Sequence, residues 1–210
     1  MTKGIAKIIS FVFHPVFSLT CLLSILVYSG DYHSYFLNPA QKLLLLIASF
    51  IFTVLLPLLN FIVLKKMGYI RSFEVTERSE RILPYLSALV LHGGLFYILM
   101  DVEVPSFYKA LVLVSFFVIL VTFILNFFIR LSAHSSAAGA FLAILLLHEG
   151  LNSAPSLIWI SIGISICGII GSARLYLEAH TEKEINVGFS AGFLTAALLF
   201  GFWLHIKWGI

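Results

Sequence analysis

The chain has 210 residues, of which 60% are hydrophobic and only 11% are charged, and its mean hydropathy is +1.06. A soluble domain of this length covers its surface with charged side chains, so the composition excludes a soluble protein and predicts an integral membrane protein in contact with the lipid bilayer. The net charge of +3, without any basic tract, gives no indication of a nucleic-acid partner.

The first predicted element is an apolar stretch near the N-terminus. Lys3 and Lys7 precede Ile8–Tyr28, which is longer than the apolar region of a signal peptide and contains His14-Pro15. We therefore expect a retained first membrane span. Six further apolar segments follow, and each predicts a membrane-crossing helix: Leu43–Leu64, Pro84–Met100, Tyr108–Ile129, Ser135–Leu147, Ser156–Arg174 and Ile185–Lys207.

Together these segments predict an all-α fold, a polytopic transmembrane helical bundle of about six to seven spans, with residues 1–210 forming a single domain. The third and fifth segments are short, so each is expected to be tilted, partly re-entrant or shielded by neighbouring helices. Small residues at positions 135–140, and Gly188 and Gly192 on one face of the last segment, predict close contact between helices.

Three clusters of polar side chains lie beside the predicted spans. The first contains Arg71, Arg78 and Arg81, the second runs from Ser132 to Ser135, and the third runs from Ser172 to Glu184. Two predicted spans separate each cluster from the next, so all three are expected at the same membrane face. Because charged groups are costly inside a bilayer, this convergence predicts a shared site.

The residue types in these clusters suit phosphate chemistry. Guanidinium groups offer planar sets of donors to phosphate oxygens, and a histidine can attack phosphorus when a carboxylate orients its ring. His180 and Glu184 are four residues apart, which makes them neighbours on a helical turn, and His134 is a candidate general acid. Arg174 precedes His180 by six residues, about 240° on a straight helix, so the helix must end near Tyr176 or the arginine must reach around it.

At these residues the chain resembles the type 2 phosphatidic acid phosphatase superfamily, which includes the vanadium haloperoxidases. The third family motif is Ser-Arg, five residues, His, three residues, Asp, and Ala173-Arg174, His180 and Glu184 have the same spacing. The second motif is Pro-Ser-Gly-His, and residues 131–134 read Leu-Ser-Ala-His. The first is Lys, six residues, Arg-Pro; Arg71 and Arg78 have that spacing without the proline, whereas Arg81 is followed by a proline at 84.

The resemblance implies a lipid phosphatase with its phosphatase-like core at about residues 65–205. It implies hydrolysis of a phosphomonoester or pyrophosphate on a membrane lipid through a covalent phosphohistidine, without a metal or any other cofactor. The implied catalytic residues are His180 as nucleophile, Glu184 as its support and His134 as general acid. The implied phosphate-binding residues are Arg174, Arg81, Arg78 and Ser132. The oligomeric state is left open.

Two other interpretations of the same residues stay open. A transporter for an anionic solute would place polar residues deep within several spans, but the predicted spans are mostly Leu, Ile, Phe and Val, with Asn60 and Asn126 as exceptions. A non-catalytic relative would bind a lipid phosphate or a protein partner. His14, His92 and His148 are weaker candidates, and none has metal-ligand spacing with another histidine.

The charge distribution and the resemblance point to opposite faces of the membrane. Ten of the 13 Lys and Arg residues fall on the face of the clusters, and three, Lys42, Lys109 and Lys207, fall on the other. The positive-inside rule therefore favours a cytoplasmic site. The resemblance implies a bacterial cytoplasmic (inner) membrane as the location of the protein. Bacterial members of the resembled family usually act on the outer side of that membrane. The face of the site is therefore left open.

Overall fold

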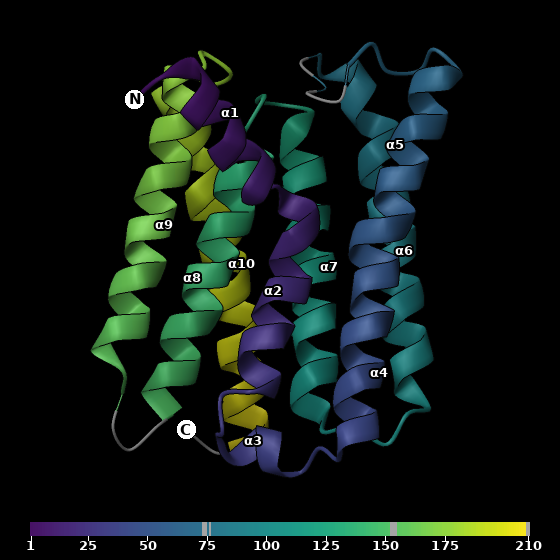
Figure 1. Cartoon of the computed structure of the whole chain (residues 1–210), viewed down its shortest axis with the longest axis vertical. Helices are drawn as coiled ribbons and strands as arrows, with labels where there is room; N and C mark the ends of the chain where they lie inside the picture. Colours follow the sequence, from purple (N-terminus) through teal and green to yellow (C-terminus); the bar gives the residue numbers. More distant parts are fainter. Residues whose placement is uncertain (73–74, 76, 152–154, 209–210) are drawn as a thin grey trace.

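The computed structural model describes residues 1–72, 75, 77–151 and 155–208, and no strand occurs among them. Figure 1 shows these residues as a bundle of long helices. The elements in chain order are α1 (Lys3–Val12), α2 (Pro15–Val27), α3 (Tyr32–Tyr35), α4 (Pro39–Phe50), a π-helical turn (Ile51–Leu55), α5 (Leu56–Lys66), a 3₁₀ turn (Ser79–Arg81), α6 (Ile82–Met100), α7 (Ser106–Asn126), α8 (Ala133–Leu151), α9 (Leu157–Tyr176) and α10 (Glu182–Trp208).

Five helical segments in the described part of the chain are long and apolar enough to cross a membrane, and α1 with α2 make a sixth if that bent pair is one span. The five are Pro39–Lys66, Ser79–Met100, Ser106–Asn126, Leu157–Tyr176 and Glu182–Lys207. Large apolar side chains such as Val90, Phe128 and Leu157 are more than 70% exposed. Water solvates such a surface poorly and lipid solvates it well. These features confirm the prediction of an all-α membrane bundle.

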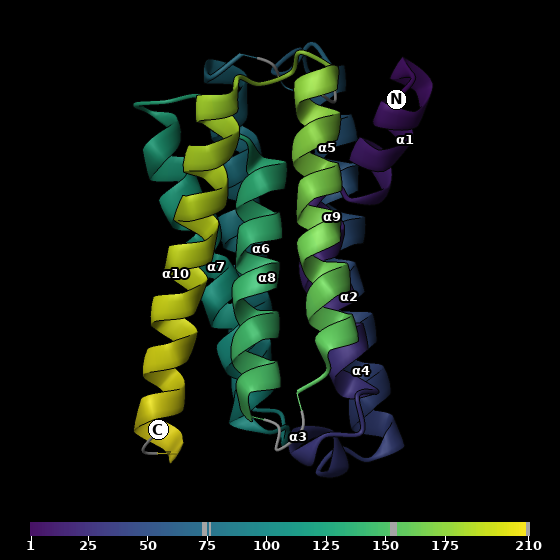
Figure 2. The same cartoon turned by 90° about the vertical axis from the view of Figure 1, so that its left-hand side faces the viewer.

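The fifth predicted segment, Ser135–Leu147, corresponds to the inner helix α8. This helix has 19 residues but is not among the five that are apolar enough to cross a membrane on composition alone. Figure 2 shows α8 beside α10 and α9 along the length of the bundle. Its buried face includes Ser135, Ser136, His148 and Glu149, because a helix that contacts protein on most sides does not need a lipid-like surface.

Glycines bring α8 and α10 into close contact. A Cβ atom added to Gly188 would lie 2.7 Å from the carbonyl oxygen of Ser132. A Cβ added to Gly192 would overlap the backbone of Ser136, and one added to Gly139 would overlap the backbone of Phe189. The predicted close contact through small residues is therefore confirmed, and it sets the distance between the start of α8 and the start of α10.

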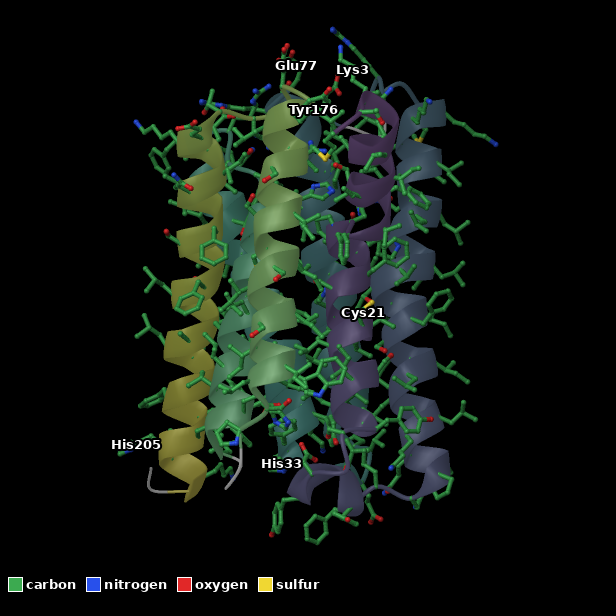
Figure 3. All side chains as sticks on the ribbon, turned by 60° about the vertical axis from the view of Figure 1, so that its left-hand side comes forward. Lys3, Cys21, His33, Glu77, Tyr176 and His205 are labelled. Carbon is green, nitrogen blue, oxygen red and sulfur yellow. The ribbon has the colours of Figure 1, made fainter. Side chains whose placement is uncertain are left out.

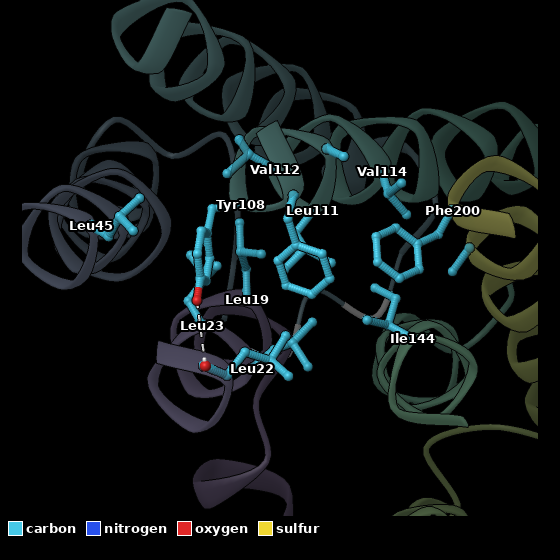
Figure 4. Close-up of a cluster of buried hydrophobic side chains, with 14 of the residues drawn as sticks. Leu19, Leu22, Leu23, Leu45, Tyr108, Leu111, Val112, Val114, Ile144 and Phe200 are labelled. Carbon is cyan, nitrogen blue, oxygen red and sulfur yellow. Dashed lines mark hydrogen bonds between the residues drawn. The ribbon is translucent and has the colours of Figure 1, made fainter. Parts of the chain in front are cut away.

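The apolar core lies in the half of the bundle farther from the starts of α8 and α10. Large side chains from five helices meet there. Figure 4 shows Leu19 from α2, Leu45 from α4, Leu111 from α7, Ile144 from α8 and Phe200 from α10 in this cluster. The hydroxyl of the fully buried Tyr108 donates a hydrogen bond of 3.5 Å to the carbonyl oxygen of Leu26, which satisfies the one polar group of that ring. This core joins α2 to the rest of the bundle.

The three polar clusters share one end of the bundle. Helices α5, α7 and α9 end, and α6, α8 and α10 begin, at the end where α1 also begins (Figure 1). Lys3, Glu77 and Tyr176 mark this end in Figure 3, whereas His33 and His205 mark the opposite one. The guanidinium of Arg81 donates to the carbonyl of Leu131, and the N–H of Ser132 donates to the carbonyl of Glu184. These contacts confirm the predicted convergence.

Candidate functional site

The third cluster is organised by the turn between α9 and α10. Helix α9 ends at Tyr176, which is one of the two arrangements that the spacing of Arg174 and His180 allows. Glu178 adopts a left-handed conformation with φ 53° that reverses the chain. Helix α10 then begins with a capping box. The N–H of Glu184 donates to Oγ1 of Thr181, and the N–H of Thr181 donates to Oε2 of Glu184 at 3.0 Å. The cap fixes the Glu184 carboxylate next to the preceding histidine.

His180 is held in one tautomer by this carboxylate. Its Nδ1 lies 3.1 Å from Oε2 of Glu184, and because a carboxylate accepts hydrogen bonds, Nδ1 carries the proton. In the neutral ring Nε2 then has a free lone pair. Burial, and next the positive charge of Arg81, lower the pKa of His180 to about 4 from its ordinary value of 6.5. At neutral pH the ring is therefore uncharged.

Arg130 belongs to this arrangement although the sequence indicated only a topological role for it. Its Nε lies 3.4 Å from Oε1 of Glu184, and its Nη2 donates to the carbonyl of Ala179 at 3.3 Å. The guanidinium thus joins the end of the α7–α8 connection to the turn before α10. The ion pair with Arg130 helps to direct the Glu184 carboxylate at the imidazole.

His134 is oriented by the N-terminal segment. Its Nε2 lies 3.0 Å from the carbonyl oxygen of Ser10 at the end of α1, and because a carbonyl accepts, Nε2 carries the proton. Nδ1 is therefore the nitrogen that can exchange a proton with a ligand. The same residue contacts a second candidate, because Nη1 of Arg174 donates to Oγ of Ser10 at 3.3 Å. Ser10 places His134 and Arg174 side by side.

Arg81 is buried, with 8% of its surface exposed, at the junction of the 3₁₀ turn and α6. Its Nε donates to the carbonyl of Val75 and its Nη1 donates to the carbonyl of Leu131, each at 2.9 Å. These bonds hold a guanidinium near His180, where its charge lowers the pKa of the ring. Among the three arginines of the first cluster, Arg81 is the one that lines the cavity described below.

Four of the candidate residues line one cavity of about 210 Å³: Arg81, His134, Arg174 and His180. Glu184 does not line this cavity. Its polar end contains the two histidines and two arginines described above, together with a histidine from the break between α1 and α2: His14, Arg81, His134, Arg174 and His180. The cavity continues along the bundle between apolar residues, including Leu19, Leu22, Val114, Val118 and Ile144. A charged end joined to an apolar chamber suits a ligand with a phosphate head and a hydrocarbon tail.

Arg78 and Ser132 do not line this cavity. Arg78 is exposed, and the structure uses its backbone carbonyl, which accepts a hydrogen bond of 3.5 Å from Asn126. Ser132 is fully buried, and its Oγ accepts from the N–H of Ser135 at the start of α8. Arg71 forms an exposed ion pair with Glu80. Phe73, Glu74 and Thr76 of the polar stretch lie outside the described residues.

A further polar cluster, formed by Asp31, His33 and His148, lies at the opposite end of the bundle. Nε2 of His148 lies 3.1 Å from Oδ2 of Asp31, and the ring of His33 stacks on Phe107 with centroids 3.9 Å apart. These contacts connect the α2–α4 segment to α7 and α8. Within the described part of the chain, no group of three or more His, Cys, Asp or Glu side chains is placed to hold a metal ion.

Ser10 is a site residue that the sequence did not indicate, and His14 was only one of its weaker candidates. The local signal was present, because a residue before proline is disfavoured in the α conformation and Pro15 cannot donate a hydrogen bond to the preceding turn. The expected single span Ile8–Tyr28 is consequently two helices, with α1 and α2 bent by 57° at this point. The destination of the His14 ring depends on contacts with α8, which local sequence does not reveal.

No protein-family model, curated protein or solved structure matches the chain.

Proposed function

We propose that the protein is a membrane-embedded phosphatase that hydrolyses a phosphomonoester or pyrophosphate group on a lipid. The observation that carries this proposal is that four side chains from separate parts of the chain line the polar end of one cavity. They are Arg81, His134, Arg174 and His180. The orientation of His180 by Glu184 supports a nucleophilic role for the ring. The resemblance of the same residues to the motifs of the type 2 phosphatidic acid phosphatases points to the same proposal.

In the proposed reaction, the lone pair on Nε2 of His180 attacks phosphorus, and the bond between phosphorus and the lipid oxygen breaks. Protonated His134 gives its Nδ1 proton to the leaving oxygen, so the lipid departs as an alcohol, or as a monophosphate from a pyrophosphate. Arg81 and Arg174 stabilise the negative charge on the other phosphate oxygens. Neutral His134 then takes a proton from water, which attacks phosphorus and releases inorganic phosphate from His180.

A lipid substrate follows from the shape of the cavity. Arg81 at the polar end and His92 deeper in the chamber both line it, and they are eleven residues apart on one helical segment, about 16 Å by the helical rise. That length is about half the thickness of a bilayer's hydrocarbon layer. A hydrocarbon chain entering beyond the phosphate would therefore lie among α2, α6, α7 and α8, with its head at the bundle end.

On the basis of the resemblance, we propose that the protein lies in a bacterial cytoplasmic membrane. The side on which the site opens is testable with a single cysteine in place of Lys183, in a background lacking Cys21 and Cys167. Modification of this cysteine in intact cells by a membrane-impermeant maleimide places the site outside, whereas modification only after lysis places it in the cytoplasm. The excess of Lys and Arg at the site end favours the second result.

The function is tested by phosphate release from a panel of purified lipid mono- and pyrophosphates in detergent or liposomes. The wild type is expected to release phosphate from at least one lipid, and His180→Ala is expected to abolish release. His205→Ala, an exposed histidine at the opposite end of the bundle, is the matched control and should retain activity. Tight lipid-phosphate binding without release would identify a binding protein, and flux of an anion into liposomes would identify a transporter.

A further inference from the structure

The break between α1 and α2 contributes a third imidazole to the polar end of the cavity. The ring of His14 lines the cavity and meets the ring of His134 edge to face, with centroids 5.2 Å apart and an interplanar angle of 84°. It also packs against Phe61, with centroids 6.4 Å apart. We propose that His14 binds a phosphate oxygen of the ligand through its Nε2–H; this inference rests on the proposed function.

The tautomer of His14 follows from its role as a helix cap. His14 is the N-cap residue of α2, and its Nδ1 accepts a hydrogen bond of 3.4 Å from the N–H of Val16. An accepting nitrogen carries no proton, so in the neutral ring the proton is on Nε2. The cap therefore leaves a hydrogen-bond donor on the side of the ring away from the backbone.

The three imidazoles consequently have different chemical roles. Nδ1 of His180 is bonded to a carboxylate, which leaves Nε2 as a nucleophile, and Nε2 of His134 is bonded to a carbonyl, which leaves Nδ1 for proton transfer. Neutral His14 has only a donor available, and giving up that proton would leave an imidazolate. It can therefore bind an anion but cannot serve as the general acid while it caps α2. This assigns His14 to phosphate binding, beside Arg81 and Arg174.

Helix α1 makes the same site dependent on the N-terminal segment. Ser10 contacts both His134 and Arg174, and His14 follows it by four residues across the bend. The bend thus supplies one direct ligand contact and orients two other groups. A straight first span would continue the helix through Pro15 and would not present His14 as a cap.

Two substitutions separate the cap from the donor. His14→Ser keeps a good N-cap side chain but is too short to reach the position of Nε2. His14→Gln places an amide N–H near that position but is a poor cap. The readouts are the dissociation constant for inorganic phosphate, measured by calorimetry on the purified full-length protein, and the thermal unfolding midpoint. Asn38→Ser, which changes the N-cap of α4 at the opposite end, is the matched control.

We expect His14→Ser to unfold near the wild-type temperature but to bind phosphate about tenfold or more weakly, as for the loss of one hydrogen bond to a charged group. We expect His14→Gln to unfold at a lower temperature and to bind phosphate within about threefold of the wild type. Asn38→Ser should leave phosphate binding unchanged. The inference would be overturned if His14→Ser, which keeps the cap, bound phosphate like the wild type while His14→Gln, which keeps the donor, bound it weakly. A wild type that binds no inorganic phosphate would also overturn it.

The same measurement keeps this inference separate from the proposed function. A wild type that binds phosphate with the His14 dependence described, yet releases none from any lipid, would contradict the phosphatase proposal and leave the binding role of His14 intact. If lipids are hydrolysed, His14→Ser should raise KM more than it lowers kcat, because the contact exists with bound substrate as well as in the transition state.

Discussion

Glu184 accepts a hydrogen bond of 3.1 Å from Nδ1 of His180, one helical turn before it, through the same oxygen that accepts from the backbone N–H of Thr181. One carboxylate oxygen thus starts helix α10 and fixes the tautomer of the proposed nucleophile. The two tasks can be separated, because the side chain of glutamine also completes a capping box but has no negative charge.

We predict that Glu184→Gln keeps the thermal unfolding midpoint close to that of the wild type and lowers kcat by about 10²-fold or more, since the loss of a carboxylate behind a catalytic histidine has effects of this size or larger. Thr181→Ala is the matched control, because it removes the Oγ1 cap and leaves the carboxylate in place. It should cost stability, about 1 kcal/mol for a lost N-cap, and little activity. Equal activity of Glu184→Gln and wild type would contradict the role of Glu184.

The low pKa of His180 predicts the acid limb of the pH profile. The neutral ring is the active form, and burial together with the Arg81 charge lowers its pKa to about 4. Activity should therefore be lost only as the pH falls through about 4, well below the ordinary value of 6.5. The measurement is kcat/KM against pH, supported by NMR titration of the His180 ring. An acid limb near 6.5 that coincides with the NMR titration of the His180 ring would refute this assignment.

The contrast between Arg81 and Arg78 gives a matched pair of substitutions. Arg81 is buried at the cavity, whereas Arg78 is exposed and outside it. We predict that Arg81→Gln lowers kcat/KM by about 10²-fold, consistent with the loss of a charge-assisted contact to phosphate, and raises the pKa of His180 toward its ordinary value. The rise should be partial because burial is the larger cause. Arg78→Gln should stay within about threefold of the wild type; the reverse order of effects would mean that the first cluster binds phosphate through Arg78.

The contact between α8 and α10 predicts a strong effect of a single methyl group. Gly192→Ala places a Cβ against the backbone of Ser136, which cannot move aside without separating the helices. We expect a loss of stability of about 1–3 kcal/mol, typical of overpacking. We also expect a loss of activity, because His134 lies in the first turn of α8 and His180 lies directly before α10. Gly201→Ala on the same helix is the control, since no atom lies within 4 Å of its added Cβ. Thermal unfolding in detergent should separate the two variants clearly.

Much of this arrangement was predictable, because it depends on the lengths of the apolar segments, on residue spacing along a helix and on the number of spans between the polar clusters. Apolar segments predict spans, even where two of them are short for a bilayer. An even number of spans between clusters then predicts that Arg81, His134 and His180 share an end. The four-residue spacing of His180 and Glu184 predicts their contact as soon as the turn before α10 becomes helical. These inferences need no knowledge of how the helices pack.

The roles of the remaining residues were not predictable, because they depend on packing between distant segments. The bond between His134 and Ser10 joins residues 124 positions apart, and no local pattern specifies it. Arg78 and Arg81 have the same chemistry in sequence, and only the 3₁₀ turn at the start of α6 directs one inward and leaves the other exposed. Ser132 matched a family motif, but its hydroxyl is used to start α8.

The most direct test of the central claim is to trap the phosphoenzyme. The protein would be mixed with a lipid substrate labelled in its phosphate, stopped with alkali after milliseconds to seconds, digested and analysed by mass spectrometry. We expect a phosphate on His180 that is stable to alkali and labile to acid, and that is absent from His180→Ala. Phosphate release with the label on another residue, or undiminished release by His180→Ala, would contradict the central claim.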